Sequence, residues 1–259
     1  EPAEYLELAD KMDAAMDFAL EAVDLFRGFE VPDIATAGDM LAMVEDDYYP
    51  VECSDQAFFL NAGIVFDANE VQEHIEEHAV PHSAALLARV RETQSPYFTG
   101  ALARVNASWQ NLGQNAKVAA AKAGLRPPEA NPFMNNVAQA VEIMDALDRC
   151  ADLCRKLAEP GAIASSSLPV PFEVKAGRAV GFTEAPRGAL FHDLTLDAEG
   201  RVTHASILTP TAQNVANLEA DMRLLAEKLV ADGAAEDVVR LEIEKLVRAY
   251  DPCLSCSVH

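Results

Sequence analysis

The spacing of apolar residues changes period along the chain, and this change limits the folds that the chain can adopt. Apolar residues at three- and four-residue steps predict helices, and alternating apolar residues predict strands. The main helices are expected over 3–26, 135–157, 211–231 and 235–250, and the strands over 180–184, 189–196 and 202–208. The last two strands are joined by Asp197-Ala198-Glu199-Gly200, a connection typical of a β-hairpin. The pattern predicts a predominantly helical α+β fold, in which a long helix bundle carries a small antiparallel β-sheet.

The order of these segments suggests three parts within one unit of 259 residues. We expect a helical part over 1–160, a small sheet over 172–210, and C-terminal helices with a cysteine motif over 211–259. Weaker patterns in the first part predict further short elements. These are helices over 69–78, 83–91 and 101–123, and strands at 58–60 and 63–66.

Charge and composition exclude several classes of ligand. The chain has 42 acidic and 20 basic residues, a formal net charge of −22, so it would repel nucleic acid and anionic membranes. No apolar run approaches the roughly 20 residues that span a bilayer, and no signal-peptide or twin-arginine pattern occurs. Five cysteines at this length do not suggest a disulfide scaffold. We therefore expect a cytoplasmic protein without a transmembrane segment. Because the first residue is Glu1, we also expect a processed chain or part of a longer one.

The last nine residues contain the strongest chemical signal. Cys253, Cys256 and His259 lie in the pattern Asp-Pro-Cys-x-x-Cys-x-x-His. Thiolates and imidazole are soft ligands suited to nickel, iron, copper or zinc, and two intervening residues let both sulfurs face one centre. Pro252 disfavours helix at Asp251, so the cysteines are expected to leave the preceding helix in an extended turn.

Two weaker constellations have structural interpretations that we favour. His74-Ile75-Glu76-Glu77-His78 matches His-x-x-Glu-His, a spacing used by some zinc peptidases, and on a helix both histidines would share a face. Because Pro81 interrupts the segment and no third ligand is apparent, an exposed helix end rich in Glu and His is the preferred interpretation. Cys150 and Cys154 are one helical turn apart and are expected to be buried core thiols.

Two turns could face an anionic ligand. In Glu184-Ala185-Pro186-Arg187-Gly188, the proline stiffens the turn and would aim one guanidinium in a fixed direction. Pro210 and Thr211 stand where the sheet passes into a helix, and a helix start offers free N–H groups and a hydroxyl. Each turn alone is a weak signal; their order before the cysteine motif strengthens both.

These three motifs together resemble the C-terminal half of the large subunit of nickel–iron hydrogenases. Two further segments, Arg104-Val105-Asn106 and Asn135-Asn136-x-Ala138, are also similar to that family. The resemblance runs through most of the chain, and it is greatest for the cytosolic branch coupled to NAD(P) or coenzyme F420. It implies a large-subunit-like fold and reversible heterolytic cleavage of H2 at a Ni-Fe(CN)2(CO) centre.

The resemblance also implies roles for individual residues. Cys253 would be a terminal nickel ligand and Cys256 would bridge nickel and iron. Arg187, paired with Asp251, would lie over the open site, and either Arg187 or a thiolate could accept the proton. His259 would bind a separate Mg²⁺ or Fe²⁺. The pocket around the cyanide and carbonyl ligands would be lined by Pro186, Arg187, Pro210 and Thr211.

The chain departs from the family pattern in one respect. The family uses four cysteines, two of them in an N-terminal Arg-x-Cys-Gly-x-Cys motif that this sequence lacks. The family's proton-relay Glu near that motif is missing too. Our hypothesis is that another polypeptide, or an N-terminal segment outside this sequence, supplies the other two thiolates.

Partners and processing are implied by the same resemblance. An iron–sulfur small subunit would hold the electron-transfer clusters, and diaphorase-type subunits would be possible further partners. In this family a protease removes a tail after the terminal His, so a chain ending at His259 resembles the mature form. Two other interpretations stay open. One is a hydrogenase-like structural or electron-transfer subunit without an active site, and the other is a helical protein with a zinc-binding tail.

Overall fold

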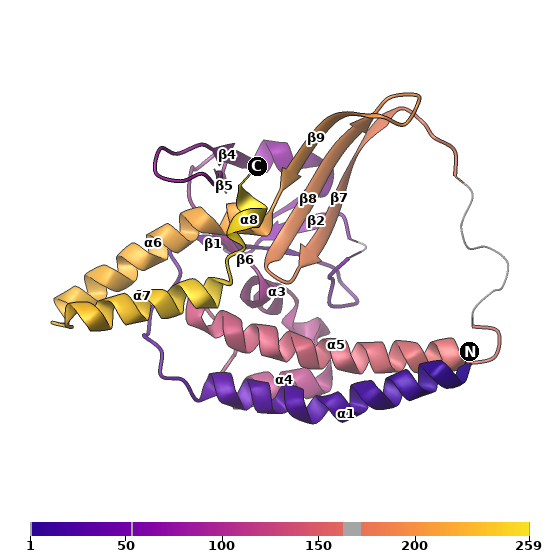
Figure 1. Cartoon of the computed structure of the whole chain (residues 1–259), viewed down its shortest axis with the longest axis horizontal. Coiled ribbons are helices and arrows are strands. Elements are labelled where there is room, and N and C mark those ends of the chain that lie inside the picture. Colours follow the sequence, from indigo (N-terminus) through magenta and orange to yellow (C-terminus); the bar gives the residue numbers. More distant parts are fainter. Residues whose placement is uncertain (1, 53, 163–171, 259) are drawn as a thin grey trace.

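The computed structural model describes residues 2–52, 54–162 and 172–258 (Figure 1). Its longest elements are α1 (Pro2–Arg27) and α5 (Asn135–Ala158), which confirm the first two expected helices. They pack antiparallel, with the start of α1 beside the end of α5 (Figure 1). Val23 of α1 and Val141 of α5 are buried in the same core, because apolar side chains four residues apart line one face of each helix.

The apolar side chains of α5 are buried near its start and partly exposed near its end. Val137 and Met144 are buried, whereas Leu153 is 55% exposed. Cys154 is buried as expected, but Cys150 is exposed, which corrects its assignment to the core. The last turns of α5 instead bury Ala151 and Cys154 against Ala9 of α1, so Leu153 lies on the opposite, solvent-facing side.

A four-stranded sheet follows α1, with strand order β3-β2-β1-β6. It contains β1 (Asp39–Met43), β2 (Gln56–Phe59), β3 (Ile64–Asp67) and β6 (Tyr97–Thr99). The expected strands at 58–60 and 63–66 correspond to β2 and β3. The other two strands were not predicted, and β1 pairs in parallel with the distant β6. Strands of three to five residues are too short to show a clear alternation.

The segment from 68 to 91 corrects two predicted helices. A 3-10 turn (Ala68–Glu70) and α2 (Val71–His74) give way to β4 (Ile75–His78), which pairs antiparallel with β5 (Leu87–Val90). His74 and His78 therefore do not share a helical face, and His74 stacks on Phe66 instead. Ile75 and Leu87 are buried by this pairing, so tertiary contacts override the local helical pattern.

The predicted helix over 101–123 is interrupted. It consists of α3 (Ala101–Ser108), a 3-10 turn (Trp109–Asn111) and α4 (Gln114–Lys122). Between them the Gly113 N–H donates to a carboxylate oxygen of Asp145 at 2.6 Å, instead of continuing a helix. A further 3-10 turn (Pro132–Met134) precedes α5.

The predicted small antiparallel sheet, its one predicted hairpin and the C-terminal helices are confirmed. The strands β7 (Gly177–Ala185), β8 (Gly188–Leu196) and β9 (Val202–Leu208) form an antiparallel sheet. It is followed by α6 (Pro210–Ala231), α7 (Glu236–Tyr250) and a short α8 (Leu254–Ser257). The α+β class is therefore correct, but the described residues contain three sheets where one was expected, and residues 1–160 are not purely helical.

The elements meet around the start of α6. Figure 1 shows α6 and α7 as a helical hairpin beside the sheets, with α8 close to the start of α6. One end of the β7–β8–β9 sheet also reaches this position, so the β7–β8 turn lies beside Asp251 at the end of α7. In the described ranges, none of the helices is long and apolar enough to cross a membrane.

Candidate functional site

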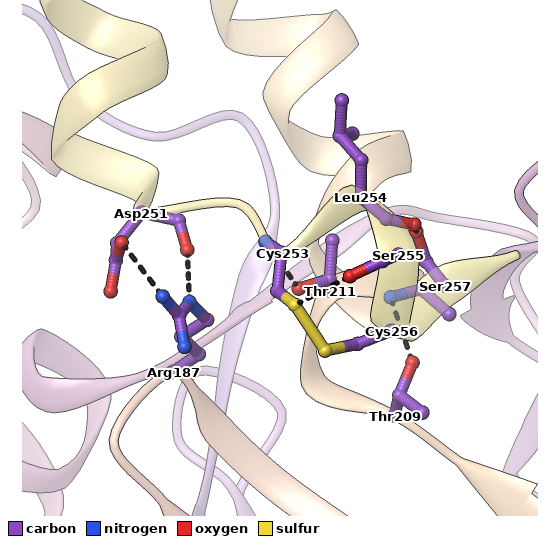
Figure 2. The surroundings of a disulfide bond; sticks show 10 residues. Arg187, Thr209, Thr211, Asp251, Cys253, Leu254, Ser255, Cys256 and Ser257 are labelled. Carbon is purple, nitrogen blue, oxygen red and sulfur yellow. Dashed lines mark hydrogen bonds and ion pairs between the residues drawn. A yellow bond between two sulfur atoms is a disulfide. The ribbon is translucent and has the colours of Figure 1, made fainter.

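Arg187 stands at the tip of the β7–β8 hairpin. Ala185 pairs with Gly188, so Pro186 and Arg187 form a two-residue turn. The Arg187 Nε donates to the backbone carbonyl of Asp251 at 2.6 Å, and Nη2 donates to its carboxylate at 3.2 Å (Figure 2). The two side chains are 39% and 42% exposed. This ion pair fixes the direction of the guanidinium while leaving it open to a ligand.

Asp251 also ends α7 and redirects the chain. Its backbone is left-handed, with φ 49° and ψ 53°, and its N–H donates to the carbonyl of Arg248. The residue before a proline avoids the right-handed helical region, and Asp tolerates the left-handed one. The expected extended turn is therefore only partly right: the chain bends at Asp251, but Cys256 lies within the short helix α8.

The two terminal cysteines are next to each other. Cys253 and Cys256 are joined as a disulfide, with their Cα atoms 5.4 Å apart (Figure 2). Since a metal needs deprotonated thiols, this oxidised pair must be reduced before it can act as a ligand pair. The spacing brings the two sulfurs to one place, whereas the shared metal centre stays a prediction.

The first turn of α6 contacts the cysteine motif. The Thr209 hydroxyl caps the helix by accepting from the N–H of Ala212, and Pro210 occupies the first turn. The Cys253 N–H donates to the Thr211 hydroxyl oxygen at 3.1 Å (Figure 2). Thr211 is only 2% exposed, so this contact ties the motif to a buried part of the fold.

The structure therefore brings together most of the expected site residues. Arg187, Asp251, Cys253, Cys256 and Thr211 are linked by the contacts above, and Pro186 and Pro210 are the sequence neighbours of Arg187 and Thr211. His259 lies outside the described residues, as does Cys53, so the metal site expected at the terminal His is not described. Within the described ranges, no three His, Cys, Asp or Glu side chains are grouped to hold a metal ion. The donor set fits half of a four-thiolate centre.

Sequence reasoning missed a buried charged cluster behind the turn. Arg104 of α3 bonds to both carboxylate oxygens of Glu142 at 2.6 Å and to Glu184 at 2.9 Å. Burial raises the pKa of the Glu184 carboxyl despite this guanidinium, and the Tyr49 hydroxyl donates to Glu142. The signal available in the sequence was an arginine inside an apolar stretch, Ala-Leu-Ala-Arg-Val, where a charge needs a partner.

Solved structures define the class of fold. The whole chain superimposes on 60% of an NAD+-reducing [NiFe]-hydrogenase chain in its H2-reduced state, with a TM-score of 0.77 and 21% identity. It also covers 61% of a chain of the Ni-Fe-Se hydrogenase from Desulfomicrobium baculatum, with a TM-score of 0.64 and 19% identity. At these identities the likeness shows a hydrogenase large-subunit fold.

Sequence comparison then gives the family. Residues 92–259 match the family model of nickel-dependent hydrogenases, and this chain belongs to that family. It is 38% identical to sulfhydrogenase 1 subunit alpha of Pyrococcus furiosus over 204 residues, covering 76% of this chain and 44% of that protein. It is 26% identical to sulfhydrogenase 2 subunit alpha of the same organism over 256 residues, covering 99% and 58%. The chain thus spans about half the length of these relatives.

Proposed function

We propose that this chain is the catalytic-subunit portion of a nickel–iron hydrogenase that cleaves H2 reversibly into protons and electrons. One observation carries the proposal: the sulfurs of Cys253 and Cys256 are adjacent, beside the first turn of α6, where the Cys253 N–H donates to Thr211. The same terminal segment also contains Asp251, which forms the ion pair with Arg187. This arrangement combines soft ligands, a nearby cation and a helix start in the order that the family motifs follow.

Each residue then has a defined task. Reduced Cys253 and Cys256 would hold the metal centre as two of its thiolate ligands, and Pro186 and Pro210 would shape the surrounding wall. The Arg187 guanidinium and the Thr211 hydroxyl would donate hydrogen bonds to negatively charged groups bound at the site. When bound, a nickel–iron centre with cyanide and carbonyl ligands would supply the Lewis acidity that polarises H2.

The proton has two candidate acceptors, and the geometry favours one. A charged guanidinium carries donors only, and Arg187 is already bonded to Asp251. A cysteine thiolate has free lone pairs. We therefore propose that a sulfur of the Cys253–Cys256 pair receives the proton, while Arg187 remains a positioned cation.

The complete site needs contributions from outside this sequence. Two more thiolates would come from a further segment or polypeptide, and electrons would pass to an iron–sulfur small subunit. A separate Mg²⁺ or Fe²⁺ at His259 remains part of the proposal. The relatives include an NAD-reducing hydrogenase subunit beta of Cupriavidus necator, 35% identical over 127 residues that cover 48% of this chain and 25% of that protein. It supports the cofactor-coupled branch, in which diaphorase-type partners and a cytoplasmic location are expected.

Metal analysis of the assembled complex tests the proposal. We expect stoichiometric nickel and iron, infrared bands from cyanide and carbonyl, and H2-dependent reduction of a dye. Full occupancy by zinc alone would instead identify a zinc-binding tail. A complex without metal or hydrogen activity would identify a related subunit that has lost its site.

A further inference from the structure

Arg104 uses all of its hydrogen-bonding capacity in one place. A guanidinium has five N–H donors, and Arg104 makes five bonds. Three go to Glu142 and Glu184, as described above, and two go to the backbone of the hairpin turn. Nη1 donates to the Ala185 carbonyl at 3.0 Å and Nη2 to the Pro186 carbonyl at 3.2 Å. The side chain is 4% exposed, so water does not compete for these bonds.

The two carbonyls constrain the backbone from which the Arg187 side chain projects. Each carbonyl oxygen lies in the plane of the peptide unit that follows it. Holding the Ala185 and Pro186 oxygens therefore fixes the peptide planes on both sides of Pro186. The second plane includes the nitrogen and Cα of Arg187, so the backbone that carries this side chain is held by Arg104, and the bonds to Asp251 hold the guanidinium.

The opposite side of the turn is held as well. The Asn214 amide donates to the Arg187 carbonyl at 3.3 Å, and the Ala189 N–H donates to the Thr99 hydroxyl at 2.9 Å. The carboxylate of Glu184 in turn accepts the N–H of Met43 at 2.7 Å. The turn is thus bonded to α3, α6 and two strand regions, while only the Arg187 side chain extends toward Asp251.

We infer that Arg104 is a positioning residue for Arg187, acting through the two carbonyls of the turn. Its effect on turnover rests on the proposed function, whereas its effect on the turn does not. Lysine is the informative replacement, because it keeps one buried positive charge for the two glutamates but has only three donors on a single nitrogen. It cannot span both carboxylates and both carbonyls.

Hydrogen–deuterium exchange of the assembled complex tests the inference without using activity. In Arg104→Lys, amides of the 185–189 turn are expected to exchange about tenfold faster, because the bonds that hold them in place are lost. Exchange at the 197–201 turn, at the other end of the same sheet, is expected to stay unchanged. Arg149→Lys is the control for the same substitution at a nearby, more exposed arginine, whose bonds go to Asp145, Tyr49 and Asn111.

Two further measurements keep the result decisive. Glu142→Gln removes a charge from the same cluster but leaves both carbonyl bonds possible, so turn exchange should stay within about twofold of the original. With H2 as substrate, Arg104→Lys should lower turnover roughly tenfold or more, because small displacements of a positioned group are costly.

Unchanged exchange at 185–189 in folded Arg104→Lys would overturn the inference. So would an increase spread equally over α3 and β7, or an equal increase in Glu142→Gln. If the unaltered complex has no hydrogen activity, the proposed function fails, but the exchange experiment still decides the role of Arg104.

Discussion

Two arginine–carboxylate pairs flank the same hairpin turn and differ mainly in their exposure to solvent. On one side, Arg104 and Glu184 have side chains that are 4% and 0% exposed. On the other, Arg187 and Asp251 are 39% and 42% exposed. The first pair is enclosed by further bonds to backbone and side chains, and the second ends at an open surface beside Cys253.

Because of this difference in exposure, we assign the buried pair a structural role and the exposed pair a role at the site. A buried ion pair must satisfy every donor and acceptor, because an unpaired buried charge is strongly destabilising. Such a pair is fixed, and its groups are not available to bind a ligand. A half-exposed pair contributes little to stability, so it is free to interact with a bound group. The fold thus uses a rigid pair to hold an accessible one.

The largest effect is expected on the accessible side, from Cys256→Ser. A serine hydroxyl is a harder and less acidic ligand than a thiol, so nickel binding and hydrogen activity should be lost. The far-UV circular dichroism should hardly change, because α8 is only four residues long. Leu254→Ala is the control, since it alters an exposed side chain of α8 without removing a sulfur. Near-normal hydrogen uptake by Cys256→Ser would rule out the assigned site.

On the rigid side, Arg104→Met is expected to lower the free energy of unfolding by about 3–5 kcal/mol, because it leaves the buried Glu184 and the partly buried Glu142 without a cation. Arg187→Met, the matched change in the exposed pair, should alter it by less than about 1 kcal/mol. Denaturant-induced unfolding of both variants measures the contrast. Similar losses in the two variants would remove the distinction between the pairs.

Gly188→Ala tests the turn between the two pairs. Gly188 has φ +129°, and a Cβ there would lie 2.6 Å from the Thr99 side chain. We expect a loss of about 1–3 kcal/mol from backbone strain and this clash. Gly181→Ala on the neighbouring strand β7 meets nothing within 4 Å and should change stability by less than about 1 kcal/mol. Equal tolerance at both sites would show that the turn can relax.

A smaller, pH-dependent effect is expected at Asp221, a buried carboxylate of α6. It accepts bonds from the Ala37 N–H and the Tyr250 hydroxyl, and no Lys, Arg or His of the described residues forms an ion pair with it. Burial raises the pKa of Asp221 above its ordinary value of 3.8. The folded state then binds the proton more tightly than the unfolded state, so this contribution to stability is lost as pH rises above about 3.8.

Comparison with Asp221→Asn isolates that contribution. As pH rises from the ordinary pKa through the raised one, the original protein should lose stability relative to the variant. This pH-dependent change in the free energy of unfolding should be smaller than the loss of stability in Gly188→Ala. Unfolding measured at several pH values gives the difference, and a constant difference between the two proteins would contradict the expected pKa direction.

The sequence by itself determined the elements whose signals are local. The helices α1, α5, α6 and α7 and the strands β7 to β9 follow from periodicities that each segment carries alone. The terminal cysteine motif was equally visible, because its two cysteines are only three residues apart. Its resemblance to hydrogenases also indicated the pairing of Arg187 with Asp251, which the structure contains.

Tertiary structure decided whatever depends on distant partners. Residues 75–78 are a strand because they pair with 87–90 and bury Ile75, although their local pattern favours helix. Arg104 meets Glu184 across 80 residues of sequence, and no local pattern indicates that contact. Periodicity reports the faces of one segment, whereas the contacts that hold Arg187 in place arise only when α3, β7 and α6 pack together.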